Sequence, residues 1–333
     1  MAVQIPWTEN WKITYKITFG TREAVGYNIP PSIVSPEWAS PKDNEYVIKS
    51  DAISKDNLSD HRGFTFRFES KQMASSEADK TEDTYLSLYN LTEEEKRVLT
   101  QPKAVVVVEA GFENKLTLCY TGDVDDISIV RSPPDYEYRI KLKAEGLALK
   151  DTMISTHYDE GMSTEDILID MIGRFNGLSK GTYGTASVKD SYKTGGRGFT
   201  GSLVTNFNKM MVMNDLEYAV TNGKMVVIPF RWLPEDYKKF TVNNTILSSD
   251  NIKEIVEIKD NKGKSSEDVK SKVKTIQINT FYIPTEIGEF ITVPTDVYDG
   301  EFAGSYLIKG RRVILESKGN AWDCVFEAEE IPV

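Results

Sequence analysis

Residues 11–19, WKITYKITF, place an aromatic or aliphatic side chain at every second position and Lys or Thr between them. Side chains alternate between the two faces of a β-strand, so this period of two predicts a strand with one buried and one solvated face. The same period recurs at residues 64–68, 116–120 and 136–142, while the continuously apolar residues 105–108 predict a strand covered on both faces. Strands therefore dominate the first 150 residues, and an antiparallel barrel with one embedded helix is expected there.

Three helices are predicted from capping and from a period of 3.6. Thr92 and Glu95 form a capping box for a short helix that Pro102 ends. Ser163 and Asp166 start a second helix, and a third is expected at residues 202–213. The apolar stripes of the last two helices comprise Leu168, Met171, Ile172 and Phe175, and Leu203, Phe207, Met210 and Met211.

The spacing of apolar residues changes along the chain between the strand period of two and the helical period of 3.6, and this change divides the chain into three predicted units. Residues 1–150 form the first barrel, with a Pro-rich connection at residues 25–60. Residues 151–228 form a small α+β unit that ends in a hairpin around Asn222-Gly223, a strong turn signal. Residues 229–333 form a second barrel, with strands at 287–293, 305–308, 312–317 and 321–327. The charged segment 259–274 is expected to be a long hairpin tip or a mobile loop. The predicted fold class is therefore β-rich α+β, with two small antiparallel β-barrels and an inserted α+β unit.

The composition excludes several classes of protein. With 40% hydrophobic and 27% charged residues the chain is globular, and no apolar run reaches the roughly 18 residues of a membrane helix. Residues 1–7 lack the pattern of a signal peptide, so a cytoplasmic product without membrane insertion is expected. The 51 acidic and 40 basic residues give a net charge of −11, which argues against adhesion to nucleic acid. The same charge suits either general solubility or a surface that DNA passes without binding.

Residues that could perform chemistry are few. Cys119 and Cys324 are far apart in sequence and are interpreted as core residues, and His157 beside acidic neighbours is interpreted as solvated. Asp123, Asp125 and Asp126 are assigned to a turn at the end of a strand, since the other ligands of a calcium loop are missing. Residues 196–201 match G-x-G-x-x-G, but the polar residues before them are not strand-like, so a flexible glycine loop is expected. No catalytic residue, cofactor site or metal site is predicted.

The order of these elements resembles a known family. A strand at residues 84–92 ends in Asn-Leu-Thr and caps a short helix; strands at 105–112, 116–120, 127–130 and 136–146 follow. The helix at 163–175, the hairpin at 217–228 and the segments 304–308 and 322–326 continue the series. This series is similar to the baseplate hub proteins of contractile-tailed phages, the group of the T-even hub and the late control protein D family. Residues 25–60 and 259–274 depart from the family pattern.

The resemblance implies a structural function and no enzymatic one. Family members carry two tube-type barrels per chain and form homotrimers, which join a six-fold tail tube to a three-fold spike. The implied partners are the tail tube protein, the spike protein and other baseplate proteins; the implied location is the virion tail baseplate, assembled in the bacterial host cytoplasm. DNA would pass through the channel without specific binding, along an anionic wall. Strands that close the sheet between subunits are expected to include Leu86, Leu88, Leu116, Leu118, Tyr120, Tyr136 and Tyr138.

Two other functions stay open on the sequence alone. One is another tail ring protein, such as a distal tail protein, a tube terminator or a hub-adjacent component. The other is an enzyme, either a tail-associated cell-wall hydrolase or a dinucleotide-binding protein. Native mass, clearing of cell-wall suspensions and thermal stabilisation by NAD separate these alternatives.

Overall fold

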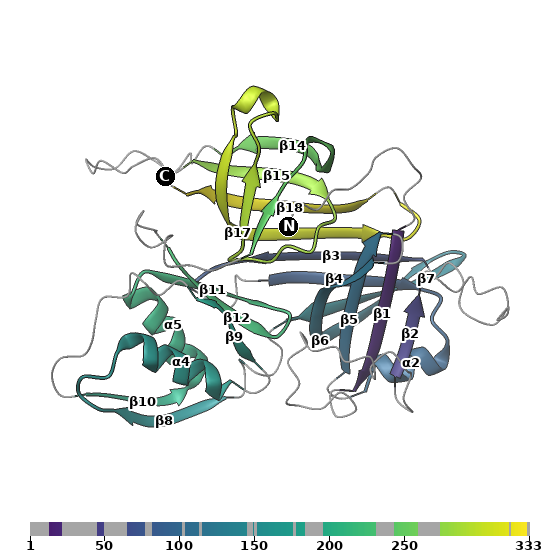
Figure 1. Ribbon diagram of the computed structural model, residues 1–333. Coiled ribbons are helices and arrows are strands. Elements are labelled where there is room, and N and C mark those ends of the chain that lie inside the picture. The colour runs from purple at the N-terminus through teal and green to yellow at the C-terminus, as the bar shows by residue number, and fades with distance from the viewer. Residues whose placement is uncertain are drawn as a thin grey trace.

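The computed structural model describes residues 13–21, 45–49, 65–76, 82–101, 104–112, 115–144, 149, 152–175, 178–183, 196–230, 243–258, 274–319 and 321–331. Strands predominate in this part of the chain, and three α-helices accompany them (Figure 1). The predicted β-rich α+β class is confirmed.

Thirteen strands form one large sheet that draws on both ends of the sequence. Its main path is β14 (Ile252–Glu257), β15 (Thr275–Phe281), β18 (Trp322–Glu330), β17 (Gly304–Glu316), β3 (Phe66–Met73), β4 (Glu82–Tyr89), β7 (Asp135–Lys143), β6 (Lys115–Ser132), β5 (Ala104–Phe112), β1 (Ile13–Thr21) and β2 (Glu45–Lys49). Two short strands, β13 (Asn244–Ile246) and β16 (Phe290–Val293), join it beside β17. The antiparallel β17–β3 pair makes the strands of the two predicted barrel regions continuous.

Strand β6 turns the sheet through a corner. Its first half pairs with β5 and its second half pairs with β7, with Asp123 belonging to both ladders. Each ladder contains a register shift, one between Leu118 and Tyr120 and one between Val124 and Asp126. A bulge bends its strand and increases the local twist. These two bulges therefore let β6 pair with β5 along its first half and with β7 along its second half. The assignment of Asp123, Asp125 and Asp126 to a strand-end turn was therefore wrong, because they lie within β6.

The middle of the chain forms a separate group of short elements (Figure 1). It contains β8 (Met153–Tyr158) paired with β10 (Arg197–Ser202), α4 (Thr164–Arg174), α5 (Leu203–Met213), and the three strands β11 (Leu216–Thr221), β12 (Lys224–Pro229) and β9 (Ser179–Tyr183). Both predicted apolar stripes are buried, and β11 and β12 form the predicted hairpin around Asn222-Gly223. Asn222 and Gly223 both have positive φ, as a tight hairpin turn requires.

The helix starts follow the predicted caps. In α2 (Glu93–Leu99) the Thr92 hydroxyl accepts from the Glu95 backbone, and the Glu95 carboxylate accepts from the Thr92 backbone, so the capping box is confirmed. In α4 the Ser163 hydroxyl accepts from the Asp166 backbone at 3.0 Å. These bonds satisfy backbone N–H groups that the first turn of a helix leaves without partners.

Three expectations about connections were wrong. The glycines at 198 and 201 lie in strand β10, which pairs with β8 along its whole length, so this stretch is not a flexible loop. The Pro-rich connection at 25–60 contains β2, which pairs with β1. The segments expected as separate strands at 305–308 and 312–317 are one strand, β17, because a bulge at Lys309 keeps its pairing with β18 continuous.

Several predicted features lie outside the described residues. They include Trp11, His61, Phe64, residues 184–195 and most of the charged segment 259–274. That segment follows β14 and precedes β15, and these two strands pair antiparallel up to the bond from the Ile258 backbone N–H to the Thr275 carbonyl.

The main core runs through the large sheet and the middle group without a break. Cys119 and Cys324 lie in it as free, buried thiols, which confirms the sequence interpretation. No helix in the described residues has the length and apolar character to cross a bilayer.

Candidate functional site: a polar face across eight strands

Eight consecutive strands of the large sheet, from β14 to the second half of β6, present one continuous polar face. Along β3, β7 and β18, and along residues 83–86 of β4 and 311–316 of β17, buried side chains alternate with more exposed ones. Paired residues of antiparallel strands share a face, so the registers align the exposed positions in rows across the sheet. One such row runs Asp323, Ile314, Glu69, Tyr85, Lys141, Asp126. We call this surface the polar face.

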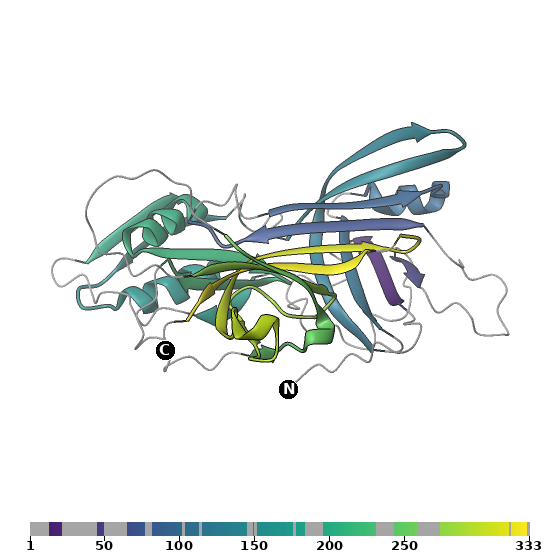
Figure 2. The ribbon, with the colours of Figure 1, turned by 90° about the horizontal axis from the view of Figure 1, so that it is seen from above.

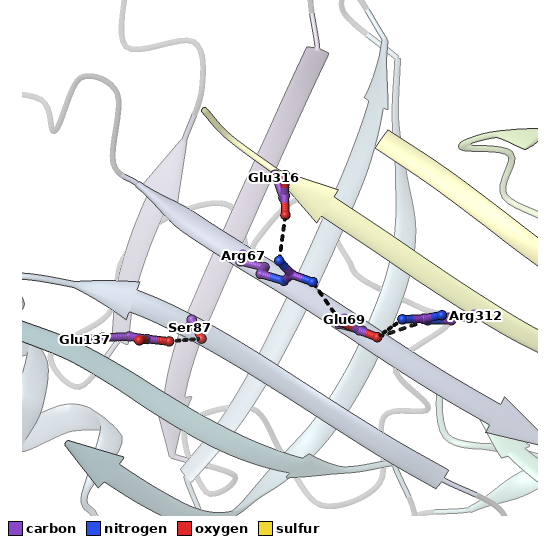
Figure 3. A network of polar contacts seen from close by, with 6 residues as sticks. All are labelled: Arg67, Glu69, Ser87, Glu137, Arg312 and Glu316. Atoms are coloured by element: carbon purple, nitrogen blue, oxygen red, sulfur yellow. Dashed lines mark hydrogen bonds and ion pairs between the residues drawn. The ribbon is translucent and has the colours of Figure 1, made fainter. Parts of the chain in front are cut away.

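Ion pairs on the polar face join strands that are distant in sequence (Figure 3). Arg67 on β3 contacts Glu316 on β17 at 3.0 Å, and its other nitrogen donates to Glu69 at 3.2 Å. Arg312 on β17 donates from Nε to the same Glu69 carboxylate at 2.9 Å. These contacts therefore cross the β17–β3 junction that links the two ends of the chain.

A second set of contacts ties β4 to β7. The Ser87 hydroxyl donates to Oε1 of Glu137 at 2.9 Å, and Nε of Arg139 donates to the same oxygen at 2.8 Å (Figure 3 shows the Ser87 contact). The cation of Arg139 is thus held beside a carboxylate on its own strand.

The pairing changes the acidity of two carboxyl groups. Burial of Glu69 works to raise its pKa, but hydrogen bonds from Arg312 and Arg67 outweigh this and leave the pKa below its ordinary value of 4.5. The hydrogen bond from Arg139, assisted by Ser87, lowers the pKa of Glu137 in the same way against a smaller effect of burial. Both groups stay ionised in mildly acidic solution.

Charges of both signs share this surface. Its exposed and half-exposed cations include Arg67, Lys71, Arg139, Lys141, Lys253 and Arg312, and its carboxylates include Glu69, Asp83, Asp126, Glu137, Glu316, Asp323 and Glu327. The net acidity of the chain therefore does not produce a uniformly anionic polar face.

A shallow depression of about 230 Å³ lies on the face where β3, β17, β18 and β15 meet. Its lining includes Lys71, Gln277, Gly310, Arg312 and Glu327. Gly310 has no side chain to fill the space beside Glu327, and the β17 bulge lies immediately before it. The depression is open and mixed in charge, and its lining contains no Ser, Thr, Cys or His side chain.

The seven residues predicted to close the sheet fall into two groups. Leu86, Leu88, Tyr120 and Tyr138 are buried inside the chain's own core. Leu118 is half-buried against Val105 and Val107, whereas 39% of Leu116 and 46% of Tyr136 is exposed. Leu116, Leu118 and Tyr120 were expected to share one buried face, and this was wrong: the bulge at Cys119 turns Tyr120 to the face opposite Leu118.

The described residues offer little for catalysis. They contain no group of three His, Cys, Asp or Glu side chains placed to hold a metal ion. His157 is an exposed residue of β8, paired with Gly198. Burial raises the pKa of the Cys119 thiol to about 12, and a thiol with so high a pKa is a poor nucleophile.

Sequence reasoning missed the polar face as a unit. Arg312 and Glu69 are 243 positions apart, and neither belongs to a motif. The available signal was the alternation Arg312, Ile314, Glu316, which marks one side of a strand but does not identify the strand beside it.

Comparison with known proteins identifies the fold. No family model matches the chain, and no curated protein sequence matches it. A chain of the lidded Francisella PdpA-VgrG complex matches with a TM-score of 0.54 and 12% identity, over 96% of this chain and 53% of that chain. Escherichia coli c3393, a type VI secretion component with structural similarity to the T4 bacteriophage tail proteins gp27 and gp5, matches with a TM-score of 0.51 and 8% identity, over 80% and 73%. The chain has the fold of phage tail and type VI secretion hub proteins.

A tail protein from Neisseria meningitidis MC58 is also similar, with a TM-score of 0.48 and 12% identity over 79% of this chain and 91% of that chain. The two matches with TM-scores above 0.5 confirm, as a shared fold, the family resemblance predicted from the order of sequence elements. At identities of 8–12%, individual residues cannot be carried over from these proteins, so the role of the polar face has to be argued from its own geometry.

Proposed function

We propose that the chain is a structural ring protein at the hub of a phage-type tail, and that its polar face lines the central channel. The observation that carries this proposal is the polar face, which runs without a break across eight strands of the large sheet. Four of its strands, β6, β7, β4 and β3, come from the first 150 residues, and four, β17, β18, β15 and β14, come from the last 100. Each chain therefore supplies two four-stranded wall segments.

Two wall segments per chain suit a protein that adapts one symmetry to another. Three copies would present six similar segments to a hexameric tail tube and still offer three-fold symmetry to a trimeric spike. Closed rings of identical chains are the common form of symmetric assembly. The homotrimer and its contacts with the tube, the spike and other baseplate proteins are part of the proposal, and so is the division of the chain at residues 150 and 228.

The charges of the polar face suit a wall that DNA passes without being held. Arg67, Arg139 and Arg312 are each bonded to a carboxylate. A cation that is already paired gains less from a phosphate group, and adhesion to DNA depends on unpaired cations that displace its counterions. The wall is thus proposed to weaken adhesion through its paired arginines, while Lys71 and Lys141 have no ion pair within the part of the chain that the structure describes.

The fold supports a structural role in a virion tail. The proteins of similar fold include a type VI secretion component, so the same ring in a secretion particle is the second candidate. In that case the channel would face protein and not DNA. Purified particles that contain the chain decide between the two, because a virion tail carries a DNA-filled head and a secretion particle does not.

The test of the ring is the native mass of the purified chain, measured alone and with the spike protein of the same particle. A trimer, or a monomer that becomes three-fold with the spike, is expected. A hexamer would favour a tube or terminator ring. A monomer that ignores the spike would contradict the proposal and return attention to enzymatic functions.

A further inference from the structure

The middle group, which comprises β8 to β12 with α4 and α5, is fastened to the large sheet by the β11–β12 hairpin. Figure 2 shows the group at one end of the molecule, and Figure 1 shows the hairpin on the side of the group nearest the large sheet. The backbones of Ser75, just beyond the end of β3, and Tyr218 on β11 exchange two hydrogen bonds of 2.9 Å. Nε2 of Gln72 on β3 donates to the Val220 carbonyl of β11 at 3.0 Å. These contacts position the group on the sheet.

The hairpin also carries one member of a buried ion pair. Lys309 is the extra residue of the β17 bulge, and only 10% of its side chain is exposed. Its ammonium group contacts Oε2 of Glu217 on β11 at 2.9 Å and donates to the Pro229 carbonyl of β12 at 2.7 Å. A buried ammonium group needs such a partner, because the loss of the carboxylate would leave an uncompensated buried charge. The pair therefore joins the middle group to the large sheet through opposite charges.

The middle group has a packed interior of its own. The Phe207 ring of α5 packs edge-on against Phe175 at the end of α4 and against Tyr218 on β11, with ring centroids 5.6 Å and 5.2 Å away. The Tyr158 hydroxyl of β8 donates to Asp170 on α4 at 2.5 Å. These contacts join the strands and helices of the group to one another, so the group can change its place without unfolding.

Lys309 has a second carboxylate nearby on the large sheet itself. Glu329 on β18 lies 3.8 Å from the Lys309 nitrogen that contacts Glu217. If the hairpin moved away, Lys309 would keep Glu329 and gain water, and Glu217 would be solvated. Separation of the group from the sheet therefore does not leave an isolated buried charge on either side.

We propose that the middle group is a movable arm, and that the Lys309–Glu217 ion pair holds it against the large sheet. The arm opens as a rigid body: the ion pair and the Ser75–Tyr218 bridge break, while the strand ladders of the large sheet stay paired. Because the main core also continues between the two parts, the closed arrangement is the more populated one. In a ring, the wall would stay intact while the arm changes its contacts with neighbouring proteins. The inference concerns a single chain, so it goes beyond the proposed ring function and does not depend on it.

Residue-resolved hydrogen exchange on the purified chain tests the arm. The backbone amides of Ser75 and Tyr218 report its opening, because each donates to a carbonyl of the other part. Glu217→Gln should raise both exchange rates about tenfold or more, since it leaves Lys309 with a poorer partner in the closed arrangement. Amides within α5 and within the β4–β7 ladder should keep their wild-type rates. The double variant Lys309→Met/Glu217→Gln removes both charges and should return the two rates to near the wild-type values.

The matched control is the Lys16–Glu109 pair, which joins β1 to β5 at the same distance of 2.9 Å and with similar burial. Glu109→Gln should leave exchange at Ser75 and Tyr218 unchanged. Unchanged rates at these two amides in Glu217→Gln would overturn the proposal, and so would rates that stay raised in the double variant. Faster exchange throughout α5 or the β4–β7 ladder would also overturn it, since the chain would then unfold and not open. None of these outcomes bears on the ring, which the native mass tests separately.

Discussion

Two nitrogens of Arg312 on β17, Nε and Nη2, donate to the same oxygen of Glu69 on β3. The pair stands on the solvated side of the strand contact that joins the C-terminal region of the chain to its N-terminal region. Arg67 contacts the other oxygen of Glu69 and also reaches Glu316 on β17. Each of the two strands therefore contributes an arginine that pairs with a carboxylate of the other: Arg312 of β17 pairs with Glu69 of β3, and Arg67 of β3 pairs with Glu316 of β17.

The Arg312–Glu69 pair is expected to contribute little to stability. Both side chains are partly solvated, and exposed ion pairs are worth about 0.2–1 kcal/mol in double-mutant cycles. Arg312→Ala, Glu69→Gln and the double variant, unfolded with urea, should give a coupling energy in that range. The pair would then matter for the surface charge of the polar face and not for the fold. A coupling energy above about 3 kcal/mol, the range of buried pairs, would contradict this reading.

Lowering the pH should weaken the coupling between Arg312 and Glu69. The pKa of Glu69 lies below its ordinary value of 4.5 in the folded chain, so the folded state binds fewer protons there than the unfolded state. The stability that Glu69 adds is thus fully present above pH 4.5 and is lost as pH falls through the lowered pKa. Wild type and Glu69→Gln should differ most near neutral pH and converge in acid. If the difference in the free energy of unfolding between wild type and Glu69→Gln grew below pH 4.5, the pKa of Glu69 could not be lowered in the folded chain.

The half-buried Glu82 of β4 connects its own strand to β6 and to the end of β7. Its carboxylate accepts hydrogen bonds from the Tyr120 hydroxyl at 2.5 Å, from Thr84 at 2.8 Å and from the Ala144 backbone at 2.6 Å. Burial nevertheless raises the pKa of Glu82. Tyr120→Phe removes one donor from this half-buried acceptor, and the expected cost is about 1–3 kcal/mol in the free energy of unfolding. Tyr136→Phe, at an exposed position, is the control and should change stability by less than about 0.5 kcal/mol. Equal effects of the two variants would contradict a structural role for Glu82.

Local features of the fold were predictable because their causes are local. The Thr92 cap, the α4 and α5 stripes and the Asn222-Gly223 hairpin each depend on residues within about one or two turns of each other. The core thiols also followed from their apolar neighbours.

The features that escaped prediction are those set by distant partners. Nothing near Arg67 indicates that Glu316 lies beside it, since the β17–β3 contact brings together residues about 250 positions apart. Bulges were missed for a related reason: at Cys119 and Asp125 one strand carries an extra residue relative to its neighbour, and a single strand cannot show that. Because the bulge at Cys119 shifts the alternation of side chains between the two faces of β6, the sequence prediction assigned Leu116 and Leu118 to the wrong face.

This correction changes what substitutions in β6 should do. Leu116 is 39% exposed, so Leu116→Asp is expected to cost less than about 1 kcal/mol. Leu118 packs against Val105 and Val107 in a small cluster outside the main core, so Leu118→Asp should cost about 1–3 kcal/mol without abolishing the fold. Leu86 is fully buried, and Leu86→Asp would place an unpaired charge in the core and should prevent folding.

Urea unfolding and native mass measured on the same three variants separate folding from assembly. Leu116→Asp should fold and still assemble, because Leu116 is exposed and lies in the first half of β6, outside the polar face. If Leu116→Asp destabilised the chain as severely as Leu86→Asp, there would be no bulge at Cys119. Leu116, Leu118 and Tyr120 would then share one buried face, as the sequence predicted. If Leu116→Asp folded but failed to assemble, the first half of β6 would take part in the contact between copies.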